Sequence, residues 1–218
     1  MIKAVLWDFG GVITTSPFEA FNRYEQDRGL PVDFIRSVNA TNPDNNAWAQ
    51  LEQNRIDLAE FDVAFARETA AAGHRIAGTD VLQLLSGDVR PSMVTALTLI
   101  KQRYRVACIT NNVQAAGSGP GMASDNAKAQ QIAGVLALFD FVLESSVVGV
   151  RKPDPRIYTM ACEKLEVDPN ETVFIDDLGV NLKPARAMGM TTIKVRSQAQ
   201  ALAELAAVLD LPELVRLP

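Results

Sequence analysis

The sequence predicts an α/β protein in which a doubly wound parallel sheet of about five strands carries a helical segment inserted after the first strand. Short apolar runs rich in β-branched residues recur along the chain, and the intervals between the last four are long enough for helices. The interval after the first run, in contrast, carries helix signals but no convincing strand. Unalternated apolar runs joined by helices are typical of a parallel sheet that is covered on both faces.

The first expected strand, AVLW at 4–7, ends in the carboxylate of Asp8. The other four runs follow the inserted segment, and they lie at 105–110, 141–145, 172–176 and 191–195. In a parallel sheet, ligands bind outside the carboxyl ends of the strands. The residues that follow these runs are therefore the candidates for a functional site.

The inserted segment is expected to open with a helix over 17–29. Ser16 and Glu19 have the spacing of a capping box, and Pro17 occupies the first helical position. Gly29 is expected to end this helix.

A second helix is expected over 57–72, because Asp57 and Glu60 form another capping box and Gly73 follows. Pro91 is expected to start the helix that leads back into the sheet. If the two inserted helices form a small bundle, their apolar faces should point at each other and leave one face toward the sheet.

These elements divide the chain into an α/β core domain over 1–15 and 89–218 and a helical cap domain over 16–88. The last helical stretch, SQAQALAELAAVLDL, carries an alanine and leucine stripe that fits the core or an oligomer face. The oligomeric state stays open between a monomer and a homodimer.

The bulk properties of the chain exclude several classes of protein. The chain has 218 residues and a net charge of −5, whereas nucleic acids and anionic membranes reward a basic face, so neither is expected as a partner. No apolar run approaches the length of about 18 residues that a transmembrane helix needs. The N-terminus turns acidic too soon for a secretion signal, which predicts a cytoplasmic protein. Cys108 and Cys162 belong to no metal-binding motif and are expected to be small buried residues.

Residues of matching chemistry follow four of the expected strands: Asp8, then Thr110 with Asn111, then Lys152, and finally Asp176 with Asp177. Carboxylates that are crowded together repel one another, and burial raises their pKa values. A divalent cation removes this conflict, and Mg²⁺ favours one or two carboxylates together with water and phosphate oxygens. The pattern therefore predicts a Mg²⁺ site for a phosphorylated ligand.

A carboxylate held beside a metal and a lysine is a competent nucleophile toward phosphorus, which would give an aspartyl phosphate on Asp8. Lys152 adds a fixed positive charge, and a threonine hydroxyl with backbone N–H groups at a strand-to-helix turn can hold phosphate oxygens. Gly10 and Gly11 allow the backbone to turn tightly and to approach metal and phosphate closely.

Four stretches carry a resemblance to a known family: WDFGGVIT, CITNN, VGVRKPDPRIY and FIDDLGVNLKPARAMGM. In this order they resemble the haloacid dehalogenase (HAD) superfamily over nearly the whole chain. The likeness is greatest to the branch with the phosphatase domain of soluble epoxide hydrolases and the related domain of some acyl-CoA dehydrogenase family proteins. It implies a Rossmann-like core with a cap and a Mg²⁺-dependent phosphohydrolase that acts on a small phosphorylated metabolite.

The resemblance also implies roles for individual residues. The metal ligands would be Asp8, the backbone carbonyl of Gly10, Asp177 directly and Asp176 through water. The phosphoryl group would be held by Gly11, Thr110, Asn111 and Lys152. The catalytic residues would be Asp8 as the nucleophile, Thr110 and Lys152.

The sequence departs from most phosphatases of this superfamily at Gly10, where they carry an aspartate that acts as general acid and base. Glycine keeps the carbonyl for the metal but cannot move a proton. Three explanations stay open: a slow or leaving-group-selective phosphatase, a substitute proton donor from Thr14, Thr15 or the cap, or a module that binds phosphorylated ligands or transfers the phosphoryl group elsewhere. A metal-independent dehalogenase-like hydrolase is a further alternative, which the retained pair of Asp176 and Asp177 disfavours.

Four other residues keep two interpretations each. Asn112 is a turn former or a site residue, and Asn181 supports the acidic turn or starts a helix. Trp48 packs the inserted segment or contacts substrate. His74 is expected to be partly exposed near a helix end, with a role as the missing proton shuttle as the minor alternative.

Overall fold

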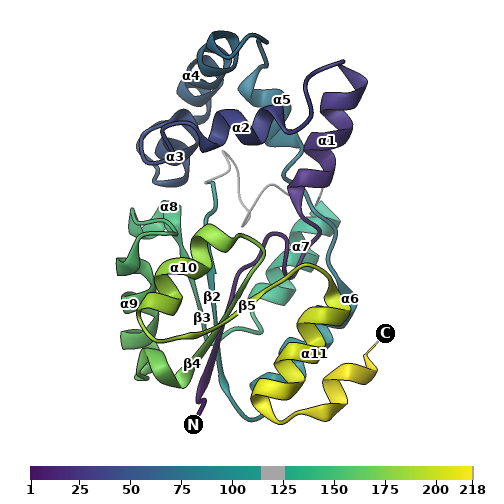
Figure 1. Cartoon of the computed structure of the whole chain (residues 1–218), viewed down its shortest axis with the longest axis vertical. Helices are drawn as coiled ribbons and strands as arrows, with labels where there is room; N and C mark the ends of the chain where they lie inside the picture. Colours follow the sequence, from purple (N-terminus) through teal and green to yellow (C-terminus); the bar gives the residue numbers. More distant parts are fainter. Residues whose placement is uncertain (114–125, 218) are drawn as a thin grey trace.

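The computed structural model describes residues 1–113 and 126–217. Five parallel strands form one sheet in the order β3-β2-β1-β4-β5 (Figure 1). The strands are β1 (Ala4–Trp7), β2 (Arg105–Thr110), β3 (Phe141–Glu144), β4 (Thr172–Asp176) and β5 (Thr191–Lys194). Each begins at the residue predicted from the sequence, and β3 and β5 end one residue earlier than expected. The predicted doubly wound α/β fold is confirmed.

Both faces of the sheet are covered, which explains why the strands carry unalternated apolar runs. In β1, Val5 and Trp7 belong to the core on one face, whereas Ala4 and Leu6 belong to the core on the other. The first face is covered by α6 (Pro91–Lys101), α7 (Asn126–Leu136), α11 (Gln198–Leu209) and the 3-10 turn Pro212–Arg216. The second is covered by α9 (Pro155–Leu165) and α10 (Gly179–Ala187), with α8 (Ser145–Val148) at its upper edge (Figure 1). A further 3-10 turn, Pro169–Glu171, precedes β4.

Between β1 and α6 the chain forms only helices, as the sequence predicted, and these lie beyond the carboxyl ends of the strands (Figure 1). We call them the helical insert: α1 (Pro17–Asp27), α2 (Phe34–Ala40), α3 (Ala47–Glu52), α4 (Leu58–Ala71) and α5 (Gly78–Gln83). They share a hydrophobic core of their own, which includes Phe21, Phe61 and Phe65. The two long helices join through α2, which contacts both α1 and α4. The sequence did not predict α2, α3 and α5, because helices of six or seven residues leave little periodic signal.

The chain leaves the core and returns to it at one place. Thr15 N donates to the Asp88 carbonyl at 2.8 Å, and Arg90 N donates to the Ile13 carbonyl at 2.8 Å. The two connecting segments therefore run side by side at the position where the sequence places the boundary between the two domains. The division into 1–15, 89–218 and 16–88 stays a prediction, which this pairing supports.

The two expected capping boxes had different outcomes. Asp57 and Glu60 form theirs at the start of α4. The capping box of Ser16 is wrong, because the Ser16 side chain makes no hydrogen bond to the start of α1. The Ser16 hydroxyl instead donates to Asp177 Oδ2 at 3.3 Å, so the side chain contacts the acidic turn of the core.

Other expectations from composition can be compared with the structure. Cys108 and Cys162 are free and buried, as expected. Among the helices of the described residues, none is both long and apolar enough to cross a membrane. The cytoplasmic location and the oligomeric state stay predictions.

Candidate active site

The register of the sheet brings three carboxylates together at the carboxyl end of its central strands. Trp7 of β1 is paired with Ile175 of β4, and Asp8 N donates to the Ile175 carbonyl at 2.9 Å. Asp8 therefore lies beside Asp176, and Asp177 follows in the next turn. The candidate ligand oxygens of the three carboxylates all lie within 4.8 Å of one another.

Lys152 lies between two of these carboxylates. Its Nζ is 2.7 Å from Asp8 Oδ1 and 2.8 Å from Asp176 Oδ2, and its side chain is completely buried. Burial lowers the pKa of Lys152, but Asp176 and Asp8 outweigh burial and raise it above its ordinary value. Lys152 is therefore a permanently charged ammonium group that holds Asp8 in place.

The carboxylates still carry more negative charge than one ammonium group neutralises. Burial and the nearby Asp176 raise the pKa of Asp8, although Lys152 partly offsets this. Burial and Asp176 also raise the pKa of Asp177, to about 6. A cluster of hard carboxylate oxygens with this excess of negative charge fits a small divalent cation such as Mg²⁺.

Asp176 is the most constrained of the three carboxylates. Its Oδ1 accepts from Leu178 N at 2.7 Å, and both of its oxygens accept from Asn181 Nδ2, at 3.1 and 3.0 Å. Together with Lys152 these contacts occupy most of its acceptor sites, whereas Asp177 accepts from Ser16. Asn181 thus supports the acidic turn, and it does so from the first turn of α10, so both interpretations apply.

The turn after Asp8 explains one of its two glycines. Gly11 has a φ of +78°, and a β-carbon there would lie 2.2 Å from Asp177 Oδ2. Only glycine can fill this position while Asp177 stays where it is. No heavy atom lies within 4 Å of the place where a β-carbon of Gly10 would sit, so the fold does not require glycine at 10.

The residues after β2 reach the same edge of the sheet. Thr110 ends β2, is half-buried and is paired in register with Glu144 of β3. The Asn111 side chain binds the backbone of Lys152: its Oδ1 accepts from Lys152 N at 2.8 Å, and its Nδ2 donates to the Lys152 carbonyl at 3.0 Å. In this arrangement the Asn111 amide positions the Lys152 loop, and its predicted role in phosphate binding stays a prediction.

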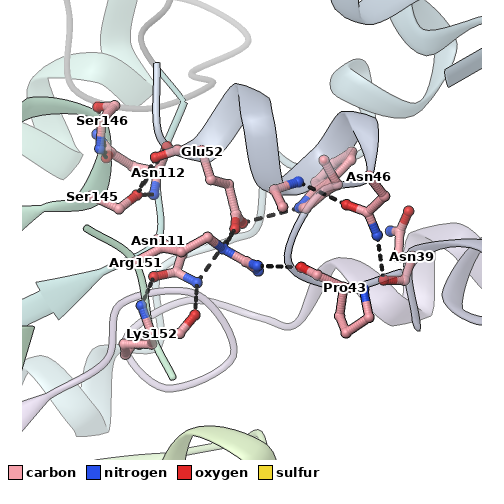
Figure 2. Close-up of polar contacts among 12 residues, drawn as sticks. Asn39, Pro43, Asn46, Glu52, Asn111, Asn112, Ser145, Ser146, Arg151 and Lys152 are labelled. Atoms are coloured by element: carbon pink, nitrogen blue, oxygen red, sulfur yellow. Dashed lines mark hydrogen bonds and ion pairs between the residues drawn. The ribbon is translucent and has the colours of Figure 1, made fainter. Parts of the chain in front are cut away.

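A buried junction between the helical insert and the core was missed by the sequence analysis (Figure 2). Glu52 Oε2 of α3 accepts from Arg151 Nε at 2.7 Å and from Asn111 Nδ2 at 3.4 Å, and Oε1 accepts from Trp48 Nε1 at 3.0 Å. The Glu52 carbonyl accepts from Ser145 Oγ at 2.7 Å. We call these five residues the Glu52 junction.

The Glu52 junction pairs one carboxylate with one guanidinium, at 2.7 Å. Burial raises the pKa of Glu52, and Arg151 partly offsets this. Arg151 also donates through Nη1 to the Pro43 carbonyl at 2.9 Å, so it binds two segments of the insert (Figure 2). Its position next to Lys152 in the sequence was a usable signal, whereas nothing distinguishes Glu52 from the other acidic residues of the insert.

The remaining polar candidates make structural contacts. Asn112 Oδ1 accepts from the backbone N and the hydroxyl of Ser146, at 3.2 and 2.9 Å, so its side chain binds the start of α8, and the choice between turn former and site residue stays open. Trp48 packs against Phe61 with ring centroids 5.3 Å apart, in agreement with its packing interpretation. His74 is exposed and lies edge-on to Phe34.

Thr14 and Thr15 follow the turn after Asp8 and lie at the connection to the insert. Thr14 Oγ1 donates to the Thr15 carbonyl at 3.2 Å, and Thr15 Oγ1 accepts from Asp88 N at 2.9 Å. Both hydroxyls are therefore engaged in this connection, and their role as substitute proton donors stays a prediction.

The comparison with protein families agrees with this geometry. The sequence matches the haloacid dehalogenase-like hydrolase family over residues 2–189. The chain belongs to this family. As a HAD-family member with relatives that are named phosphatases, it is a hydrolase.

Relatives of the chain include long and short proteins. It is 40% identical over 217 residues to bifunctional epoxide hydrolase 2 of Sus scrofa, and 30% identical over 216 residues to acyl-CoA dehydrogenase family member 10 of Mus musculus. The matches cover 94% and 96% of this chain but only 38% and 19% of those proteins. Phosphatase MT3486 of Mycobacterium tuberculosis is 28% identical over 230 residues, which cover 96% of this chain and 97% of that protein.

Solved structures share the fold. A HAD family enzyme of Bacteroides thetaiotaomicron in complex with magnesium and inorganic phosphate superposes with a TM-score of 0.58 at 19% identity, covering 90% of this chain and 95% of that one. The L-2-haloacid dehalogenase of Xanthobacter autotrophicus superposes with a TM-score of 0.60 at 20% identity, covering 95% and 83%. The fold is therefore shared by an enzyme that binds magnesium and phosphate and by a dehalogenase, so the function has to be argued from the site.

Proposed function

We propose that the protein is a Mg²⁺-dependent phosphohydrolase that acts on a small phosphorylated metabolite through an aspartyl phosphate on Asp8. The observation that carries this proposal is the contact of the buried Lys152 ammonium with Asp8 inside a group of three carboxylates. Relatives named as phosphatases and a similar fold that holds magnesium and phosphate support it. A metal-independent dehalogenase would have no divalent cation to balance the charge of the three carboxylates.

The proposed metal ligands are Asp8, the carbonyl of Gly10, and Asp177, with Asp176 acting through water. Asp176 suits the indirect role because Lys152, Leu178 N and Asn181 already occupy its oxygens. When bound, Mg²⁺ neutralises the carboxylates and draws electrons from the phosphoryl oxygens.

The proposed reaction has two displacements. An Asp8 carboxylate oxygen attacks phosphorus, the bond from phosphorus to the ester oxygen breaks, and the leaving group takes a proton from solvent. Lys152, the Thr110 hydroxyl and the backbone N–H groups of Gly11 and Asn111 hold the phosphoryl oxygens. Water then attacks the aspartyl phosphate, which releases inorganic phosphate and restores Asp8.

Gly10 sets the expected selectivity. A general acid contributes about 10²–10⁴-fold, and most to leaving groups that need protonation. We therefore expect acyl and aryl phosphates to be cleaved well and alkyl phosphates poorly. The alternative proposal is a module that binds phosphorylated ligands or transfers the phosphoryl group with little hydrolysis.

The test is phosphate release with Mg²⁺ from acetyl phosphate, p-nitrophenyl phosphate and an alkyl phosphate. We expect activity on the first two only, loss of activity in Asp8→Asn and in EDTA, and a gain on the alkyl ester in Gly10→Asp, which has room for the new side chain. Activity that survives Asp8→Asn would refute the proposed nucleophile. Phosphate binding without turnover in both the native protein and Gly10→Asp would favour the alternative.

A further inference from the structure

A cavity of about 380 Å³ opens beside the cluster of three carboxylates, between the helical insert and the carboxyl end of the sheet. We call it the basic cavity, because its charged lining consists of four cationic side chains and two carboxylates: Arg36, Arg90, Lys194, Arg196, Glu19 and Asp177. The whole chain, in contrast, carries a net charge of −5. The cationic excess is therefore local to this cavity.

Two of the cations make contacts with neighbouring residues of the core and of the insert. Arg90 Nη1 donates to the Gly11 carbonyl at 2.7 Å, which ties this half-buried side chain to the turn after Asp8. Arg36 of α2 forms an ion pair with Asp33 at 3.0 Å, and its guanidinium lies 4.4 Å from the centre of the Phe18 ring. The core and the insert thus each contribute one positioned guanidinium.

The other two cations lie at the surface of the cavity. Lys194 and Arg196 are exposed at the end of β5, and neither forms an ion pair within residues 1–113 and 126–217. Lys194 Nζ lies 3.9 Å from the position that a β-carbon of Gly179 would occupy, so its ammonium sits over the first residue of α10. The N-terminal end of that helix adds positive partial charge to the same wall.

The cavity shares two residues with the proposed site. Gly11 and Asp177 belong to its lining, and they are also a proposed phosphate contact and a proposed metal ligand. If Asp177 binds the metal, Glu19, whose charge acts on Arg90, is the other carboxylate of the lining. A substrate with its phosphoryl group at Asp8 can therefore extend its leaving group into a cavity with an excess of cations.

We propose that the basic cavity binds a second anionic group, a carboxylate or a further phosphate, on the leaving-group side of the substrate. This inference rests on the proposed function and narrows its substrate class to small phosphate esters with two anionic groups. Lys194 and Arg196 are the specificity residues, since both are exposed and form no ion pair among the described residues, whereas Arg90 is bound to the Gly11 carbonyl and Arg36 to Asp33.

The test measures binding rather than turnover, with phosphonates that cannot be hydrolysed. Methylphosphonate carries one anionic group, phosphonoacetate adds a carboxylate, and methylenebisphosphonate adds a second phosphonate. Calorimetric titrations with and without Mg²⁺ would use the native protein, the double variant Lys194→Gln with Arg196→Gln, and a control with Lys183→Gln and Arg103→Gln. The control removes the same charge from exposed residues outside the cavity lining.

Phosphonoacetate and methylenebisphosphonate each carry two anionic groups. We expect the native protein and the control to bind at least one of them about tenfold more tightly than methylphosphonate, as hydrogen bonds to charged groups would give. The cavity variant should lose this preference and keep its affinity for methylphosphonate. Whichever of phosphonoacetate and methylenebisphosphonate binds more tightly identifies the second group as carboxylate or phosphate. Equal binding of all three by the native protein would overturn this inference alone, whereas no binding of any of them would overturn the proposed phosphate site with it.

Discussion

The two sides of the candidate site are built in opposite ways. At the Glu52 junction, the buried carboxylate meets a guanidinium, an indole N–H and an amide, so the charges are matched inside the protein. In the basic cavity, cations outnumber carboxylates, and Lys194 and Arg196 form no ion pair with the described residues. The charge of Glu52 is paired inside the protein, whereas the charges of Lys194 and Arg196 can bind an anionic ligand.

This difference suggests two roles: the Glu52 junction positions the insert relative to the core, and the basic cavity can bind a substrate. The Glu52 junction links α3 of the insert to Asn111, and Asn111 holds the backbone of Lys152. The place of the insert is thereby coupled to the ammonium group that holds Asp8. In the basic cavity the Ser16 hydroxyl donates to Asp177 at 3.3 Å, but Lys194 and Arg196 form no ion pair with the described residues, so their charges remain available to a substrate.

The largest effect is expected from breaking the junction with Glu52→Gln. The change leaves Arg151 with an uncompensated charge in a largely buried place, which should lower the free energy of unfolding by about 3 kcal/mol. Because Asn111 loses a charged partner, kcat should fall more than KM rises. Urea unfolding and steady-state kinetics measure the two effects.

Two controls sharpen this prediction. Lys194→Gln, in the basic cavity, should change stability by no more than about 0.5 kcal/mol because Lys194 is exposed and forms no ion pair with the described residues. Lys3→Gln removes the exposed ion pair with Glu171, which contributes at most about 1 kcal/mol. Equal destabilisation by all three changes would contradict the contrast between the two sides.

A second comparison concerns neighbouring glycines. Gly11→Ala places a β-carbon against Asp177 at a positive φ and should destabilise the protein by about 2 kcal/mol while weakening Mg²⁺ binding. Gly10→Ala should be tolerated to within about 1 kcal/mol, since open space surrounds that position. Thermal unfolding and Mg²⁺ titration of both variants check this, and equal effects would show that the turn adapts.

The smallest expected effect is the pH dependence of Mg²⁺ binding. Protons compete with the metal for Asp177, whose pKa is raised to about 6 by burial and by Asp176. Proton competition at Asp177 alone should lower the Mg²⁺ association constant about tenfold per pH unit below pH 6, and the raised pKa of Asp8 should steepen the fall. Calorimetric titrations between pH 5 and pH 8 measure this dependence.

Ser16→Ala provides the matched variant for this measurement. The Ser16 hydroxyl hydrogen bond lowers the pKa of Asp177. Its removal should raise that pKa, so the Mg²⁺ association constant should begin to fall at a higher pH. A constant affinity from pH 5 to pH 8 in both proteins would argue against Asp177 as a metal ligand.

The sequence by itself determined the sheet and the chemistry at its edge. Apolar runs locate strands, and parallel topology brings the residues that follow them to one end, so Asp8, Lys152 and Asp176 could be expected together. The hydrophobic pattern is a local property of the chain, which is why each strand could be located to its first residue.

Only the tertiary structure decided which polar side chains meet around that centre. Glu52 and Arg151 are 99 positions apart, and Ser16 and Asp177 are 161 apart, so no local pattern links the members of either pair. The same holds for Gly11, which must be glycine because Asp177 lies against it, and for the basic cavity, whose cations come from separate elements. Such contacts depend on how the helical insert is placed over the sheet, and packing of distant surfaces rather than local propensity sets that placement.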